Sequence, residues 1–131
     1  MSGLSNEVLI VDDEFVIVRL LSIYVEEMGL KVCASAGTAD DAIRLAQEHR
    51  PGVVLMDMRL QGQKDGVDAA LAIHETIGSK VIFITGSSEP ATVARIQLDH
   101  PSAVLTKPVT ERQVRAAIEE AMGAVQSNKR S

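Results

Sequence analysis

The sequence has few of the residues that mark several classes of protein. Its single cysteine, Cys33, excludes an internal disulfide or a cysteine zinc cluster and favours a reducing compartment. The formal net charge of -5 and the 2% of aromatic residues leave no basic, aromatic-interleaved surface for nucleic acid. Apolar runs stay far below the ~20 residues of a membrane span, and residues 1–6 lack the segments of a signal peptide. We therefore expect a cytoplasmic protein that binds neither nucleic acid nor a membrane.

Length and hydrophobic content indicate a single folded domain. The 131 residues are 46% hydrophobic and 24% charged, which is ordinary for a globular protein and too apolar for a disordered one. One domain over residues 1–125 accounts for the length, and residues 126–131 are expected to form a frayed tail.

Five short apolar segments alternate with stretches of helical periodicity. Because the third and fourth segments are continuously apolar, they are typical of central parallel strands buried on both faces. Five strand and helix units are too few for a barrel of ~250 residues, so the pattern favours an open, doubly wound sheet. We expect an α/β fold of the flavodoxin-like (βα)5 kind, with five parallel strands in the order 2-1-3-4-5. The expected strands are residues 8–11, 31–36, 53–56, 81–85 and 103–106.

Capping residues and apolar spacing mark the helices between these strands. Thr38 is an expected N-cap, and Thr110 with Gln113 is expected to form a capping box. Pro90 fits the first turn of a helix, and Gly29 follows the first helix as a stop. The core-facing stripe expected for the first helix is Ile17, Leu20, Leu21, Tyr24, Val25 and Met28.

Polar residues directly follow most of the expected strands. Because the carboxyl ends of parallel strands meet at one edge of a sheet, we expect these residues to converge there. A nucleotide site would need glycines in the first turn, whereas carboxylates in that turn suit Mg²⁺. Two carboxylates ~4 Å apart repel by roughly 4 kcal/mol at an effective dielectric of 20, so the cluster needs a metal ion or an ammonium group. The residues are Asp12, Asp13, Asp57, Thr85 and Lys107.

Each of these residues has an ordinary structural explanation when it is taken alone. A single aspartate after a strand is more often a helix N-cap or a turn residue, Thr85 could be a strand-end hydroxyl, and Lys107 a solvated charge. Their joint placement at the ligand-binding edge of this fold is what indicates a functional site.

Five short motifs in this set resemble the receiver domain of two-component response regulators, in its stand-alone form. They occur in the family's order and at nearly its spacing, and the resemblance covers residues 7–124. The motifs are Val-Asp12-Asp13-Glu, Leu-Met-Asp57, Asp65-Gly66, Ile-Thr85-Gly and Thr-Lys107-Pro108.

The resemblance implies that Asp57 is a phosphoacceptor. It would take a phosphoryl group from the phosphohistidine of a sensor histidine kinase or a histidine phosphotransfer protein, as part of a phosphorelay. The acids Asp12 and Asp13 would hold Mg²⁺ together with Asp57 and the backbone carbonyl of Arg59. Such a chain is not an enzyme with a separate substrate, since it catalyses only its own phosphorylation and dephosphorylation.

The resemblance also implies how the signal leaves the domain. Thr85 and Lys107 would contact the phosphoryl oxygens, and Thr85 would move toward them. The family usually has an aromatic residue three positions before the lysine, but this chain has Val104, so we expect the loop 86–90 and the next helix to repack instead. The output surface would be the helix after Pro90, the strand 103–106 and the last helix, which would contact a downstream protein.

Two departures and one surface feature complete the expectations. The loop 58–65 is about one residue longer than the family pattern and has Gln61 where a proline often stands. On a helical wheel, Phe15 and its neighbour Val18 fall outside the core stripe of the first helix, and we expect them to help dock the phosphodonor. The alternative is that Phe15 only covers the loop at the start of the helix.

Other functions remain open at this point. A haloacid-dehalogenase-like phosphatase also uses an aspartate after a strand, but it needs a second acid at the position of Arg59. A flavodoxin-like electron carrier needs a phosphate loop rich in Thr, Ser or Gly in place of the acidic turn. A docking module that is never phosphorylated would leave the acidic pocket without a chemical role.

Overall fold

Five parallel strands form the centre of this computed structural model, which describes residues 3–86 and 90–130, with the backbone alone for 124–130. The strand order is β2-β1-β3-β4-β5, which confirms the expected doubly wound, flavodoxin-like sheet. The strands are β1 (Ser5–Val11), β2 (Lys31–Ala36), β3 (Pro51–Asp57), β4 (Lys80–Thr85) and β5 (Ala103–Thr106). The helices are α1 (Phe15–Glu27), α2 (Ala39–His49), α3 (Gly66–Thr76), α4 (Pro90–Gln97) and α5 (Glu111–Arg130).

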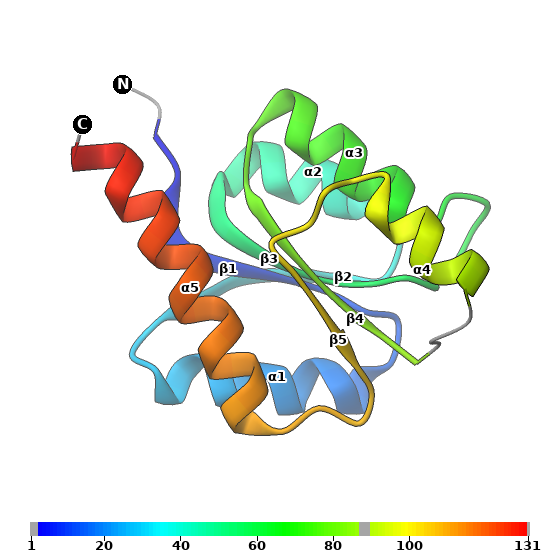
Figure 1. The fold of residues 1–131 in the computed structure, drawn as a ribbon, viewed down its shortest axis with the longest axis horizontal. Helices are drawn as coiled ribbons and strands as arrows, with labels where there is room; N and C mark the ends of the chain where they lie inside the picture. The colour runs from blue at the N-terminus through cyan, green and yellow to red at the C-terminus, as the bar shows by residue number, and fades with distance from the viewer. Residues whose placement is uncertain (1–2, 87–89, 131) are drawn as a thin grey trace.

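Helices cover both faces of the sheet (Figure 1). One core cluster lies under α1 and α5, and the other lies under α2, α3 and α4. Every residue of β3 is buried, as expected for a central strand with helices on both sides. The described residues include no helix that is long and apolar enough to cross a membrane.

The expected helix caps are present. The hydroxyl oxygen of Thr38 accepts a hydrogen bond from the N–H of Asp41 at 3.1 Å. Thr110 and Gln113 form the reciprocal pair, in which the Thr110 hydroxyl accepts at 3.1 Å and the Gln113 side chain accepts at 2.9 Å. Because these caps satisfy backbone donors that a helix leaves free, they place the first turns of α2 and α5.

Two expectations about helices differ from the structure. The last helix, α5, continues to Arg130, past the expected end of the domain at residue 125, while Ser131 lies outside the described residues. In α1, Leu20 is 37% exposed instead of facing the core, and the partly buried Val18 packs against the core instead. The rest of the expected stripe is confirmed, because Leu21 and Val25 are buried and Ile17, Tyr24 and Met28 pack against the same core.

The start of α3 lies directly against the end of β3. A Cβ atom at Gly66 would collide with the carbonyl oxygen of Asp57, so only glycine allows this approach. Asp65 caps the helix through a reciprocal pair with Asp68, at 3.0 and 2.9 Å. The residues that begin α3 are thereby fixed next to the last residue of β3.

Charged contacts hold α4 and the segment after it onto α3. Arg95 on α4 contacts Asp65 at 2.7 and 3.0 Å and Asp68 at 3.0 Å. After α4, the buried carboxylate of Asp99 lies 2.7 Å from Nδ1 of His74 on α3. The hydrogen bond to Asp99 raises the pKa of His74 above its usual value. These contacts position the face of the domain that carries α4.

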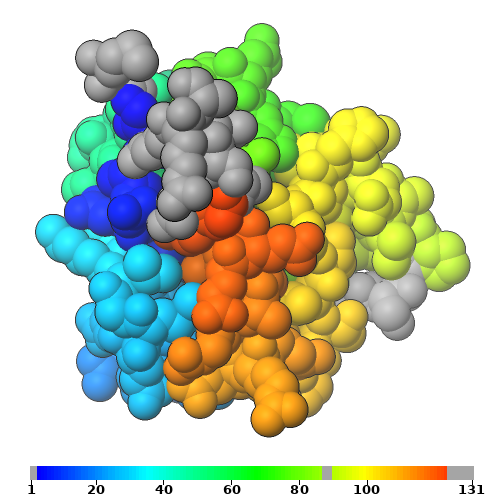
Figure 2. Space-filling view, turned by 60° about the vertical axis from the view of Figure 1, so that its left-hand side comes forward, coloured from blue at the N-terminus to red at the C-terminus, as the bar shows by residue number. Residues whose placement is uncertain are grey.

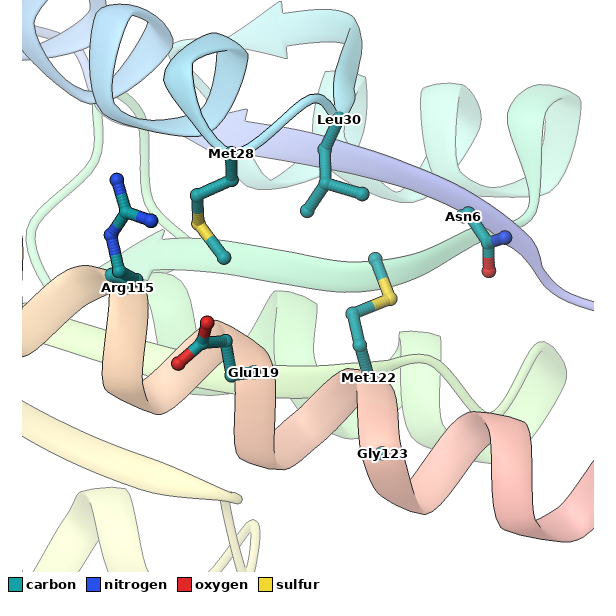
Figure 3. Close-up of a pocket in the computed structure, with 7 residues that line it drawn as sticks. All are labelled: Asn6, Met28, Leu30, Arg115, Glu119, Met122 and Gly123. Carbon is teal, nitrogen blue, oxygen red and sulfur yellow. The ribbon is translucent and has the colours of Figure 1, made fainter.

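A hollow of about 290 Å³ remains on the opposite face, between the end of α1 and α5. Figure 3 shows Met28 at the end of α1 and Met122 on α5 on two sides of it, with Leu30 between them. Arg115 and Glu119 lie on α5 at its edge.

Candidate functional site

The carboxyl ends of β1 and β3 bring three carboxylates together. Val11 pairs with Met56, so Asp12 and Asp57 follow at the same level on neighbouring strands. Both are buried, with Asp57 only 7% exposed, whereas Asp13 is exposed. The ligand atoms of the three aspartates lie within 4.8 Å of one another. The sequence prediction that these acids converge is confirmed.

Lys107 supplies the positive charge at this cluster. It follows β5, and its N–H donates to the carbonyl oxygen of Thr85 at 2.8 Å, which places its side chain at the same edge. The ammonium nitrogen lies 3.2 Å from Asp12 Oδ2 and 3.5 Å from Asp57 Oδ1. Burial alone would lower the pKa of Lys107, but the nearby carboxylates outweigh burial and raise it. The lysine therefore stays charged.

One ammonium group does not fully compensate two buried carboxylates. Burial, followed by the negative charge of Asp12, raises the pKa of Asp57 from 3.8 to about 6. Lys107 and the N–H of Met58 act in the opposite direction and limit the rise. At neutral pH the Asp57 carboxylate is thus ionised but poorly stabilised, which favours any further cation that reaches it.

Glu14 is a member of this group that the sequence analysis did not select. Its Oε1 lies 3.7 Å from the Lys107 ammonium, and its N–H donates to Asp12 Oδ1 at 2.8 Å. The backbone contact orients the Asp12 carboxylate. The sequence feature that could have indicated Glu14 is the run of three acids, Asp12, Asp13 and Glu14, of which only the two aspartates were expected to have a role.

Thr85 and Val104 lie on β4 and β5, on the other half of the sheet from Asp12. Thr85 is the last residue of β4, is buried, and pairs with Thr106 in register. Val104 pairs with Phe83 and is partly buried, and it packs on the hydrophobic core under α2, α3 and α4. The position where the family usually has an aromatic ring is therefore filled by a small side chain against the core.

The loop after β3 is attached to the start of α2. The N–H of Gln61 donates to the carbonyl oxygen of Gly37 at 3.2 Å, and Lys64 contacts Asp40 at 2.9 Å. Arg59 is exposed in this loop, two residues after Asp57. The expected use of its carbonyl as a metal ligand stays a prediction.

An open hollow of about 290 Å³ adjoins the acidic cluster. Asp12 and Asp13 line one part of it, and Phe15 and Val18 of α1 line another. Phe15 is 75% exposed, and Val16 beside it is 74% exposed. Apolar surface therefore borders the carboxylates, as the docking hypothesis requires.

The cluster suits a hard divalent cation. All three of its candidate side chains offer oxygen atoms, which Mg²⁺ prefers, and the exposed side of Asp13 leaves room for the water molecules that Mg²⁺ keeps. The raised pKa of Asp57 indicates that its negative charge is not fully compensated, so a bound cation would stabilise it. A nucleophilic carboxylate, a fixed ammonium group and a metal site together fit phosphoryl transfer.

Comparison with known proteins supports one family. The family model of the response regulator receiver domain matches residues 8–119. The chain is 33% identical over 130 residues to the phyllosphere-induced regulator PhyR of Methylorubrum extorquens, covering 98% of this chain and 48% of PhyR. It is 31% identical over 121 residues to the transcriptional regulatory protein PdtaR of Mycobacterium tuberculosis, covering 92% of this chain and 58% of PdtaR. The chain thus spans about half the length of these relatives.

A solved structure of a receiver domain has the same fold as this chain. The signal receiver domain of a modulated diguanylate cyclase from Desulfovibrio desulfuricans superposes with a TM-score of 0.87 and 31% identity. The match covers 93% of this chain and 97% of that one.

Replacing Asp57 by asparagine is expected to stabilise the metal-free protein at neutral pH. Because folding raises the pKa of Asp57 from 3.8 to about 6, its ionisation opposes folding. The penalty is absent below the unfolded pKa, grows as the pH rises, and is complete above the folded pKa. D57N should therefore raise the unfolding temperature at about pH 7.5 more than at about pH 4.5.

Circular dichroism melts in a chelator measure this difference. Glu75→Gln, which changes an exposed acid on α3, is the matched control and should show no such gain. An equal gain from D57N at both pH values would contradict the raised pKa.

Proposed function

The chain belongs to the response regulator receiver domain family, and we propose that Asp57 is its phosphoacceptor. Accepting a phosphoryl group in two-component signalling is the role of this family. The observation that carries the assignment is the buried Asp57 carboxylate at the end of β3, 3.5 Å from the Lys107 ammonium and beside Asp12. In the transfer, a carboxylate oxygen of Asp57 bonds to phosphorus as the phosphorus–nitrogen bond of the donor phosphohistidine breaks.

Asp12 and Asp13, with Asp57 and the carbonyl of Arg59, are the proposed ligands of Mg²⁺. Bound Mg²⁺ would neutralise charge on the phosphoryl oxygens. Asp12 is oriented for this role by the N–H of Glu14 at 2.8 Å. The support is the oxygen-only donor set within 4.8 Å.

Lys107 and Thr85 are the proposed contacts of the phosphoryl group. The Lys107 ammonium already lies between the two buried carboxylates, so a phosphoryl group on Asp57 arrives next to a fixed positive charge. Thr85 ends the strand next to β3 and is joined to Lys107 through the backbone. The proposal makes the chain an acceptor that catalyses only its own phosphorylation and dephosphorylation, in the cytoplasm.

Phosphorylation of Asp57 should be direct and should depend on Mg²⁺. Incubation with Mg²⁺ and acetyl phosphate is expected to add one phosphoryl group to the wild-type chain, read by intact mass. D57N should take up none, and D12N or D13N should slow uptake because the cation that offsets the phosphoryl charge is held less well.

Glu48→Gln, an exposed change on α2, is the control that should be phosphorylated at the wild-type rate. Phosphorylation of D57N at the wild-type rate would contradict the assignment of Asp57 as the phosphoacceptor. A folded wild-type chain that never takes up phosphate would support the docking module instead.

We propose that the phosphodonor docks on the start of α1. Phe15 and Val18 line the hollow that also contains Asp12 and Asp13, so a protein seated there would bring a phosphohistidine close to Asp57. Val18 also packs on the core, which leaves Phe15 and Val16 as the freely exposed part of this surface. A donor of this kind is a sensor histidine kinase or a histidine phosphotransfer protein.

Phe15→Ala is expected to slow phosphotransfer from the cognate donor protein and to leave labelling by acetyl phosphate intact. The reason is that a small phosphodonor needs no apolar docking surface. Rates are followed by radiolabel or intact mass with both donors. Leu98→Ala, which removes an exposed apolar side chain after α4, is the control. Equal loss with both donors would point to a folding defect rather than docking.

The proposed output surface is made of α4, β5 and α5. Figure 2 shows the α4 to β5 region lying beside α5 on one face of the molecule. The Arg95 contacts with Asp65 and Asp68 connect this surface to the segment that follows Asp57. Because Val104 replaces the usual ring, the switch would be a repacking of the segment after Thr85 and of α4. Residues 87–89 of that loop lie outside the described residues.

Phosphorylation should change backbone NMR shifts mainly in residues 85–106. Thr85→Ala should still be phosphorylated on Asp57 but should fail to shift this segment, because the hydroxyl that is drawn toward the phosphoryl group is gone. Thr76→Ala, an exposed hydroxyl change at the end of α3, is the control. Identical shift patterns in phosphorylated wild type and phosphorylated T85A would rule out Thr85 as the relay.

A further inference from the structure

A second group of metal-ligating side chains lies near the amino end of the sheet, away from the acidic cluster. Glu7 on β1, Cys33 on β2 and His49 in the last turn of α2 have ligand atoms that all lie within 4.8 Å of one another. All three side chains are partly buried. Along β1, Glu7 and Asp12 are five residues apart, which is about 17 Å of extended strand. The two groups are therefore separate sites.

Cys33 lies on the same face of the sheet as the other two side chains. Glu7 pairs with Lys31, and Cys33 follows Lys31 by two residues, so it is on the same side of β2. Val32 between them packs on the face covered by α1, whereas Cys33 packs on the face covered by α2. The register shift comes after Val32, so Ala34, which pairs with Leu9, also packs on the face covered by α2.

The other two ligands reach the same place from neighbouring elements. Glu7 alternates in phase with Leu9, whose side chain belongs to the cluster under α2. Its carboxylate contacts the Lys31 ammonium at 3.7 Å, but that lysine side chain is 76% exposed, and such a surface pair is weak. His49 arrives from the end of α2. A cation can therefore displace Lys31 without breaking a buried contact.

We propose that Glu7, Cys33 and His49 bind Zn²⁺, with a water molecule as the fourth ligand. Zinc takes thiolate, imidazole and carboxylate ligands at about 2.0 to 2.3 Å, which puts tetrahedral ligand atoms roughly 3.3 to 3.8 Å apart. The observed ligand atoms lie within 4.8 Å of one another, so their separations need to shrink by at most about 1.5 Å to reach that size. Sulfur and nitrogen donors favour Zn²⁺ over Mg²⁺, so the two sites of the domain differ in the cation they select.

Binding exchanges the thiol proton for the metal ion. In the free chain, burial and then the Glu7 carboxylate raise the pKa of the Cys33 thiol to about 11, so the sulfur carries a proton at neutral pH. The sulfur–zinc bond forms as the S–H bond breaks, and the proton goes to solvent. No electron is transferred in this step.

Cobalt substitution tests the proposal on the full chain, reduced and stripped of metal. Co²⁺ is expected to produce a thiolate-to-metal charge-transfer band that saturates at one equivalent, is removed by one equivalent of Zn²⁺, and is unaffected by excess Mg²⁺. The band should be lost in Cys33→Ser and weakened in His49→Gln and in Glu7→Gln. It should persist in Asp13→Asn, which alters only the acidic cluster, and in Glu48→Gln, which alters a neighbouring exposed acid of α2.

A second measurement covers variants whose folding is in doubt. Zn²⁺ should slow alkylation of Cys33 and raise the unfolding temperature of the wild-type chain, and it should do neither in folded His49→Gln. The proposal is overturned if folded wild type gives no charge-transfer band. It is equally overturned if His49→Gln and Glu7→Gln bind Co²⁺ as tightly as wild type, since the cysteine alone would then account for binding.

Discussion

The proximity of two buried carboxylates, Asp12 and Asp57, is the constraint on which the rest of the site depends. Strand order makes it unavoidable, because β1 and β3 are neighbours, Asp12 directly follows β1, and Asp57 ends β3 at the same level. The fold provides one fixed counter-charge, Lys107, at 3.2 and 3.5 Å from the pair. A single ammonium leaves the pKa of Asp57 at about 6. The remaining imbalance favours a further cation beside Asp57, which is the basis of the proposed Mg²⁺ binding and phosphoryl transfer.

The same end of β3 is connected to the surface that would carry the signal. Gly66 lets α3 begin against the carbonyl of Asp57, and Asp65 caps that helix. Arg95 on α4 binds the capping carboxylate through two nitrogen atoms, at 2.7 and 3.0 Å. The Arg95 contacts lower the pKa of Asp65 even though burial acts against this, so the cap is ionised across the physiological range. A chain with Val104 in place of a ring therefore still has a direct polar connection between α4 and the segment that follows Asp57, the proposed phosphoacceptor.

Features that depend on short stretches of sequence were predictable, and those that depend on distant pairs were not. The strands 31–36 and 103–106 and the caps at Thr38 and Thr110 follow from local apolar runs and capping chemistry. The convergence of the site residues followed from the rule that strand ends share an edge. By contrast, Arg95 lies 30 residues from Asp65, and nothing in either neighbourhood indicates the pair. The helical-wheel prediction for α1 placed Leu20 in the core, but Leu20 is exposed. The neighbouring elements that pack on the helix, and not its ideal periodicity, decide which of its side chains are buried.

The group at the amino end was also beyond sequence analysis, because its members come from β1, β2 and α2. Glu7 and Cys33 share the α2 side through the pairing of Glu7 with Lys31, two residues before Cys33, and His49 approaches them from the last turn of α2. A cation bound there would connect β1, β2 and α2. The position of Asp12 also depends on β1 and on its pairing with β2. A ligand shifts a conformational equilibrium only by its difference in affinity for the two states. Because the pairing of β1 with its neighbours is shared by any state that keeps this sheet, such a cation would stabilise the fold as a whole and would not by itself favour the signalling state.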